Sequence, residues 1–213
     1  MTPGPNELVK CPACGDYQQR RTLRSGNTVG ATFYSDGKRV APMLPEFPYF
    51  IKCPKCGKFF TISREVISND KLADGERSPF VRFLTIDEYK QAIEEGLVNG
   101  KDSDILLLRT FLWRAYNDII RQGGEIEEKE RVFYEENCRT IIAEKEDELK
   151  DGAPELDGDR LMCAELWRNI GEFDKSKAML NAISRQNDYK RYIDAIRTAC
   201  DAKNPLTVRI TFD

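Results

Sequence analysis

CPACG, at residues 11–15, recurs almost unchanged as CPKCG at residues 53–57. Each copy separates two cysteines by two residues, so that one tight turn presents two sulfur atoms. Proline after the first cysteine restricts the turn, and glycine after the second permits the positive φ that lets backbone N–H groups point at sulfur. We interpret the repeat as two halves of one metal site, with Cys11, Cys14, Cys53 and Cys56 as ligands.

Four thiolates are a tetrahedral donor set that suits zinc and leaves no coordination position for water, so the pattern predicts structural Zn²⁺. Iron or a redox switch is the alternative, although a thioredoxin-like pair needs a strand-to-helix junction that neither copy has. The 38 residues between Cys14 and Cys53 exceed the usual spacing of about 15–20. Either a hairpin is inserted in the ribbon, or each pair contributes to an intermolecular site.

The chain has 213 residues and no histidine, which excludes His-based acid/base catalysis and mixed Cys/His metal sites. Neighbouring acids occur at Glu127/Glu128, Glu135/Glu136 and Asp157/Asp159, where we expect polar helix faces or loops. No P-loop, nucleotide-binding glycine motif or nucleophile elbow is present. We therefore expect no enzyme, no catalytic residues and no small-molecule substrate.

The other three cysteines, Cys138, Cys163 and Cys200, occur singly on apolar helical faces. We expect them to be buried free thiols that behave as small hydrophobic residues. No run of about 18 apolar residues predicts a membrane helix, and the N-terminal stretch lacks the features of a secretory signal. A cytoplasmic location with reduced thiols is the expectation.

The succession of hydrophobic patterns predicts an α+β protein. Residues 1–67 are expected to form a small zinc-ribbon β domain, with a type I′ hairpin turn at Asp36-Gly37 and a strand over 58–66. Residues 68–103 form a linker, with the boundary stretch at 68–79 and one short helix capped by Thr85 and Glu88. Residues 104–204 form a helical domain, with amphipathic helices over 104–121, 125–149, 158–170, 174–184 and 187–201.

The last segment, residues 205–213, contains LTVRITF at 206–212, which alternates apolar and polar residues as a half-buried strand does. A lone strand is not stable. We therefore expect it to pack back, onto the N-terminal β region or onto FVRFLT at 80–85.

The helical segment LMCAELWRNIGEFDKSKAMLNAI, at 161–183, resembles a tetratricopeptide (TPR) unit. Ala164 and Ser176 occupy the small positions of its two helices, Trp167 the aromatic position and Gly171 the turn. A four-cysteine zinc ribbon followed by TPR-like helices resembles a group of bacterial proteins of unassigned role. The resemblance implies a protein-interaction role and carries no catalytic residues with it.

The favoured function is a non-enzymatic scaffold module whose TPR-like helices bind a protein or peptide partner. The alternative is nucleic-acid binding by the ribbon, because residues 1–67 hold ten Lys/Arg against five Asp/Glu. The basic side chains are Arg20, Arg21, Arg24, Lys38, Arg39, Lys52, Lys55 and Lys58. They are interleaved with aromatic residues suited to base stacking, namely Phe33, Tyr34, Tyr49, Phe50, Phe59 and Phe60.

Overall fold

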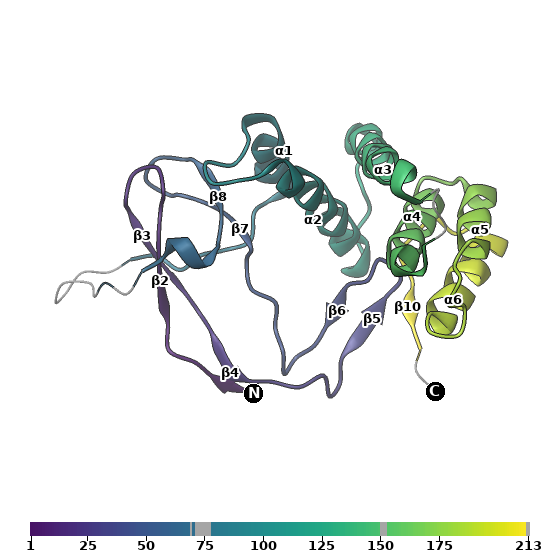
Figure 1. Ribbon diagram of the computed structural model, residues 1–213, viewed down its shortest axis with the longest axis horizontal. Helices are drawn as coiled ribbons and strands as arrows, with labels where there is room; N and C mark the ends of the chain where they lie inside the picture. Colours follow the sequence, from purple (N-terminus) through teal and green to yellow (C-terminus); the bar gives the residue numbers. More distant parts are fainter. Residues whose placement is uncertain (69, 71–77, 150–152, 212–213) are drawn as a thin grey trace. The chain divides into compact units, whose positions relative to one another are not determined.

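The computed structural model describes residues 1–68, 70, 78–149 and 153–211 and confirms the α+β class. Figure 1 traces the chain by colour, from purple at the N-terminus to yellow at the C-terminus. Contacts within the chain divide it into two units. Unit 1 comprises Met1–Ala31 and Ala41–Leu112, and unit 2 comprises Thr32–Val40 and Trp113–Asp213. The domain boundaries expected at 67, 103 and 204 stay predictions, and most of the stretch 68–79 lies outside the described residues.

Short antiparallel strands build the β part of unit 1. β2 (Glu7–Lys10) pairs with β3 (Tyr17–Arg20) and with β9 (Ile67–Ser68), while β7 (Phe50–Lys52) pairs with β8 (Phe59–Thr61). β1 (Thr2–Pro3) pairs with β4 (Leu23–Ser25). The strand predicted over 58–66 is shorter than expected, because a 3-10 helix, η1 (Arg64–Val66), replaces its second half.

Helices α1 (Ile86–Glu95) and α2 (Asp102–Arg121) follow the strands. The predicted capping box of α1 is confirmed: Thr85 Oγ1 accepts from the N–H of Glu88 at 3.2 Å, and the Glu88 carboxylate accepts from the N–H of Thr85 at 3.0 Å. The Asn99 side-chain amide makes two hydrogen bonds with the backbone of Thr61, both at 2.9 Å: its Oδ1 accepts from the N–H of Thr61, and its Nδ2 donates to the Thr61 carbonyl. These bonds attach the segment between α1 and α2 to β8.

Unit 2 contains the rest of α2 together with α3 (Glu128–Leu149), α4 (Asp157–Asn169), α5 (Phe173–Asn181) and α6 (Lys190–Asp201); η2 (Pro154–Leu156) precedes α4. The predicted helices are confirmed to within a few residues at each end. An apolar cluster joins α4, α5 and α6, and its buried members are Ala164, Leu180, Ile183, Ile193, Ile196 and Cys200. Nowhere in the described ranges does a helix reach the length and apolar character needed to cross a membrane.

A hairpin from the N-terminal third of the chain completes unit 2. It consists of β5 (Thr32–Tyr34) and β6 (Arg39–Val40), and β10 (Arg209–Ile210) adds to β5 with Arg209 opposite Tyr34. The predicted return of the C-terminal strand to the N-terminal β region is therefore confirmed. Of the strand predicted over 206–212, only Arg209 and Ile210 have strand pairing, and Phe212 lies outside the described residues.

The turn of this hairpin differs from the predicted type I′ turn, which needs positive φ at two successive residues. Among the described turn residues only Gly37 has a positive φ, 75°. The physical reason lies in Asp36, which is 3% exposed rather than solvated. Its carboxylate accepts hydrogen bonds from Asn117 Nδ2 at 3.0 Å and Arg121 Nη1 at 2.6 Å, so helix α2 holds the turn.

A second buried polar network joins α4 to the hairpin and to the C-terminal segment. The Glu165 carboxylate accepts from Ser35 Oγ at 2.6 Å and from the Arg168 guanidinium, and both charged side chains are 0% exposed. Arg168 Nη1 also donates to the carbonyl oxygens of Asn204 and Leu206, at 2.5 and 2.7 Å. Each charge is thus matched, as buried charges must be.

Candidate metal centre

The two cysteine turns repeat in structure as they do in sequence. In the first, the N–H of Cys11 donates to the Asp16 carbonyl at 2.8 Å, and the N–H of Gly15 donates to the Cys11 carbonyl at 2.9 Å. The second turn has the equivalent bonds, both at 2.9 Å: the N–H of Cys53 donates to the Lys58 carbonyl, and the N–H of Gly57 donates to the Cys53 carbonyl. Gly15 and Gly57 have φ of 76° and 73°, a backbone conformation that glycine adopts without strain.

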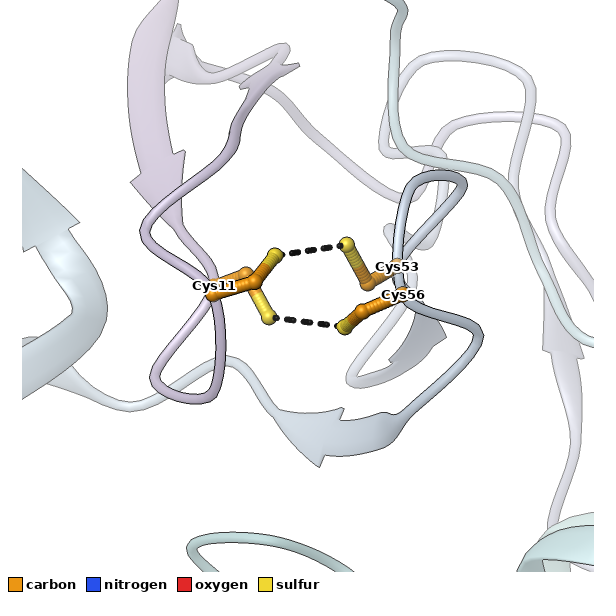
Figure 2. Close-up of side chains that lie close together, drawn as sticks. Cys11, Cys53 and Cys56 are labelled. Carbon is orange, nitrogen blue, oxygen red and sulfur yellow. Dashed lines mark hydrogen bonds between the residues drawn. The ribbon is translucent and has the colours of Figure 1, made fainter.

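Each turn closes an antiparallel hairpin at its tip. Lys10 pairs with Tyr17 at the end of β2 and β3, and Lys52 pairs with Phe59 at the end of β7 and β8. The first cysteine therefore follows directly after a paired strand, which fixes its position. Figure 2 shows the two turns facing each other, with their sulfur atoms directed into the space between them.

The four sulfur atoms all lie within 4.8 Å of one another. Cys11 Sγ is 3.7 Å from Cys56 Sγ, and Cys14 Sγ is 3.6 Å from Cys53 Sγ. A tetrahedral zinc site with Zn–S bonds of about 2.3 Å has sulfur–sulfur edges of about 3.8 Å. The spacing fits a single tetrahedral ion. Because one chain brings all four sulfurs together, an intermolecular site is not needed to complete the ligand set.

The two turns also share a pattern of burial. The first cysteine of each, Cys11 and Cys53, is 2% and 1% exposed, whereas Cys14 and Cys56 are exposed. Both buried cysteines belong to an apolar cluster in unit 1, whose buried members are Val9, Cys11, Ile51, Cys53, Phe60, Ile62 and Val66. The candidate centre is therefore continuous with the hydrophobic core, and a metal there would brace the core directly.

The pKa values of the thiols follow the same division. Without a cation, burial raises the pKa of Cys11 to about 12 and also raises the pKa of Cys53. A hydrogen bond from the Lys58 backbone lowers the pKa of Cys56 to about 7. The buried thiols ionise readily only if a nearby positive charge offsets their desolvation, and a divalent cation provides that charge.

The other predicted residues have different surroundings. Cys138, Cys163 and Cys200 are buried as expected, and burial raises the pKa of each thiol. Of the acids considered for catalysis, Asp157 is 0% exposed rather than on a polar face. Its carboxylate accepts from Arg160 Nη1 at 2.8 Å and from the backbone N–H groups of Ser184 and Arg185 at 3.0 and 2.9 Å. Asp157 thus fastens the start of α4 to the segment after α5.

The basic and aromatic residues suggested for nucleic-acid binding have different surroundings. Phe50, Phe59 and Phe60 are at most 1% exposed and belong to the interior. Three basic side chains lie near acidic ones: Arg20 near Glu7 at 3.6 Å, Lys55 near Asp16 at 3.7 Å and Lys58 near Glu95 at 3.9 Å. Lys38 and Arg39 belong to the hairpin of unit 2.

Sequence reasoning did not identify Asp36, Glu165 or Arg168 as interior residues. The spacing of Glu165 and Arg168, three residues apart on a helix, is typical of a solvated ion pair, so no local signal marked it. Comparison of the chain with family models, with curated proteins and with solved structures found no match. Function must therefore be argued from the cysteine cluster and the surrounding fold.

Proposed function

We propose that this protein is a non-enzymatic interaction module in which a structural zinc ion stabilises unit 1 and TPR-like helices of unit 2 bind a protein or peptide partner. The sulfur arrangement carries the first half of the proposal. Four cysteine ligands at tetrahedral spacing fill the coordination sphere and leave no position for water or substrate, which is the hallmark of structural sites.

Zinc is favoured over iron because structural zinc sites use four thiolate ligands in tetrahedral geometry, and Zn²⁺ has no redox chemistry. The test is elemental analysis of protein purified without chelator. We expect one zinc per chain and none in a Cys11→Ser/Cys53→Ser variant. One iron per chain, or a metal-free protein whose unit 1 is folded, would contradict the assignment.

The helices of unit 2 support the interaction half. Ala164 and Ser176, at the small positions of the TPR pattern, are both 0% exposed. Ser176 Oγ accepts from the Cys200 thiol at 3.4 Å, so α5 and α6 approach closely at this residue. Small residues at such positions let paired helices pack tightly, and stacked pairs of this kind present surfaces to partners. Unit 2 holds 19 Lys/Arg against 23 Asp/Glu, which favours a basic partner segment.

Nucleic-acid binding by the ribbon has weaker support. Half of the aromatic residues suggested for stacking lie in the core, and several basic residues have acidic neighbours. Unit 1 as a whole is almost neutral, with fourteen Lys/Arg and thirteen Asp/Glu. Nucleic-acid affinity depends on neutralising several phosphates, and this balance leaves little net charge for that purpose.

The interaction proposal is tested by affinity capture from native lysate, with and without nuclease. We expect a protein partner whose capture resists nuclease. Capture that disappears with nuclease would transfer the function to nucleic acid. Absence of any captured macromolecule in both arms would contradict the interaction role.

A further inference from the structure

Unit 1 has a groove of about 710 Å³ that none of the four cysteines lines. Its walls come from four segments: the N-terminal residues, the connection from β3 to β4, residues 45–48 and residues 80–83. Rings dominate the lining, with Pro3, Pro45, Phe47, Pro48, Phe80 and Phe83. The groove is therefore mainly apolar and rich in aromatic and proline surfaces.

Two phenylalanine rings of the groove are strongly exposed. Phe80 is 44% exposed and Phe83 is 46% exposed. The N–H of Gln19 donates to the Pro79 carbonyl, and the N–H of Val81 donates to the Gln19 carbonyl, both at 2.8 Å. Phe80 thus forms a parallel bridge with Gln19 of β3, which fixes the backbone at this ring. Apolar side chains that gather at the surface of an ordered groove mark an interaction site.

Two arginines line this groove, and they differ in their partners among the described residues. The guanidinium of Arg21 lies 4.9 Å from the centre of the Phe80 ring, and within the described part of the chain no carboxylate pairs with it. The second arginine, Arg82, forms two 2.6 Å bonds with the Glu88 carboxylate. The acidic lining residue, Glu46, has an interaction of its own. Of the two lining arginines, Arg21 is therefore the one whose guanidinium is available to a carboxylate of a ligand.

We propose that this groove binds an extended, proline-containing peptide segment of a partner protein, with an acidic side chain of the peptide placed against Arg21. Proline-rich segments are already extended before binding and pack their rings on aromatic grooves at low entropic cost. A carboxylate facing Arg21 adds a charge-assisted bidentate hydrogen bond. The proposal rests on the proposed interaction function and names a class of partner for it. It places the binding site on unit 1 instead of on the helices of unit 2.

A single-stranded nucleic acid is the competing occupant, because an arginine over a phenylalanine ring can also stack a base. The charge of unit 1 decides against it. Fourteen basic residues are offset by thirteen acidic ones, whereas a backbone-binding groove needs several unmatched cations along its length. The guanidinium of Arg21 can bind one carboxylate of a peptide, whereas a nucleic-acid backbone presents a phosphate at every nucleotide.

The test is selection of a random dodecapeptide phage library on the immobilised full-length protein. We expect enriched peptides to contain proline together with at least one acidic residue. The best peptide is then titrated against Arg21→Glu and Phe83→Ser, each of which should weaken binding at least about tenfold. Arg64→Glu and Val29→Ser are matched controls in unit 1, since both residues are exposed and neither lines the groove. They should leave the affinity within about twofold.

Three results would overturn the proposal: no enrichment, enrichment of basic or proline-free peptides, or unchanged affinity in the Arg21 and Phe83 variants. A fluorescein-labelled (dT)₂₀ or U₂₀ oligonucleotide provides the second arm, at low salt. Oligonucleotide binding that both groove variants abolish would assign the groove to nucleic acid. If affinity capture from lysate succeeds equally with the groove variants, the groove proposal fails and the interaction function stands.

Discussion

One apolar cluster of unit 1 has seven buried members, two of which are cysteines of the candidate metal centre. Unit 2 instead packs whole helices together and buries charged residues such as Glu165 and Arg168 among them, each paired. A metal held by cysteines that belong to an apolar cluster contributes its binding free energy to the fold around them. Unit 1 should therefore depend on metal binding at this candidate centre, whereas unit 2 should depend on packing and on fully matched charges.

The largest expected effect is the loss of the metal centre. Cys53→Ser removes one ligand, and structural zinc contributes on the order of 10 kcal/mol to domains of this kind, so unit 1 should unfold. Both tryptophans, Trp113 and Trp167, lie in unit 2, and their emission should stay native. Metal analysis, amide NMR and tryptophan fluorescence together measure the outcome.

Cys163→Ala is the matched control, because Cys163 is equally buried but lies in unit 2. It should keep its metal and the amide spectrum of unit 1. If Cys53→Ser unfolds both units together, the contrast between them is lost.

The second largest expected effect tests whether the stability of unit 2 depends on the pairing of its buried charges. Arg168→Met leaves the Glu165 carboxylate buried without its main partner, which typically costs about 3–5 kcal/mol. Urea unfolding followed by tryptophan emission measures this loss, and metal content should not change. The double variant Glu165→Gln/Arg168→Met should be less destabilised than Arg168→Met, because no uncompensated charge remains. Equal loss in both would mean that burial of the charge is unimportant.

A smaller, pH-dependent effect belongs to Asp157. Burial alone would raise the pKa of this carboxyl, but hydrogen bonds from Arg185, Ser184 and Arg160 outweigh it and lower the pKa to about 2 from its ordinary 3.8. A lowered folded-state pKa gives stability that is present above pH 3.8 and is lost as the pH falls towards 2.

Asp157→Asn should destabilise unit 2 by about 1–3 kcal/mol at neutral pH, since it weakens hydrogen bonds to a charged group. It should also flatten the stability of unit 2 between about pH 4 and 2. Urea unfolding of the variant and the parent over this range tests the assignment, which fails if the two pH profiles run parallel.

The smallest effect returns to unit 1. Thr85→Ala removes the hydroxyl that accepts from the N–H of Glu88 at the start of α1, and loss of such a cap costs about 1 kcal/mol. Amide exchange in α1 should accelerate, while α4 and α5 should not change. Thr140→Ala in α3 is a suitable control, since its hydroxyl bonds a carbonyl within the helix and caps nothing. Similar losses from both substitutions would contradict a specific capping role.

Features with a local cause could be predicted from the sequence. Each cysteine turn depends on five consecutive residues, and its glycine has the predicted positive φ. The capping box depends on Thr85 and Glu88 alone, and the helices depend on a periodicity that their own residues supply. The clustering of the four sulfurs was also expected, because each turn supplies two of the four ligands that a tetrahedral metal site needs.

Features that depend on distant partners could not be predicted in this way. Asp36-Gly37 looks like an exposed turn, yet Asn117 and Arg121 capture its aspartate and select another turn geometry. The groove of unit 1 draws its lining from four separated segments, so no window of sequence contains it. The geometry of both sites is therefore set by contacts between residues far apart in the sequence, which local propensity cannot reveal.

The pairing of β10 with β5 has a consequence for biosynthesis. Arg209 lies opposite Tyr34, 175 positions away in the chain. A ribosome that adds about 5–20 residues per second makes Tyr34 roughly 9–35 s before its partner. All four cysteines of the candidate centre have been translated once Cys56 is made. The β5–β6 hairpin gains its pairing with β10 only after Arg209 and Ile210 have been added, long after that ligand set is complete.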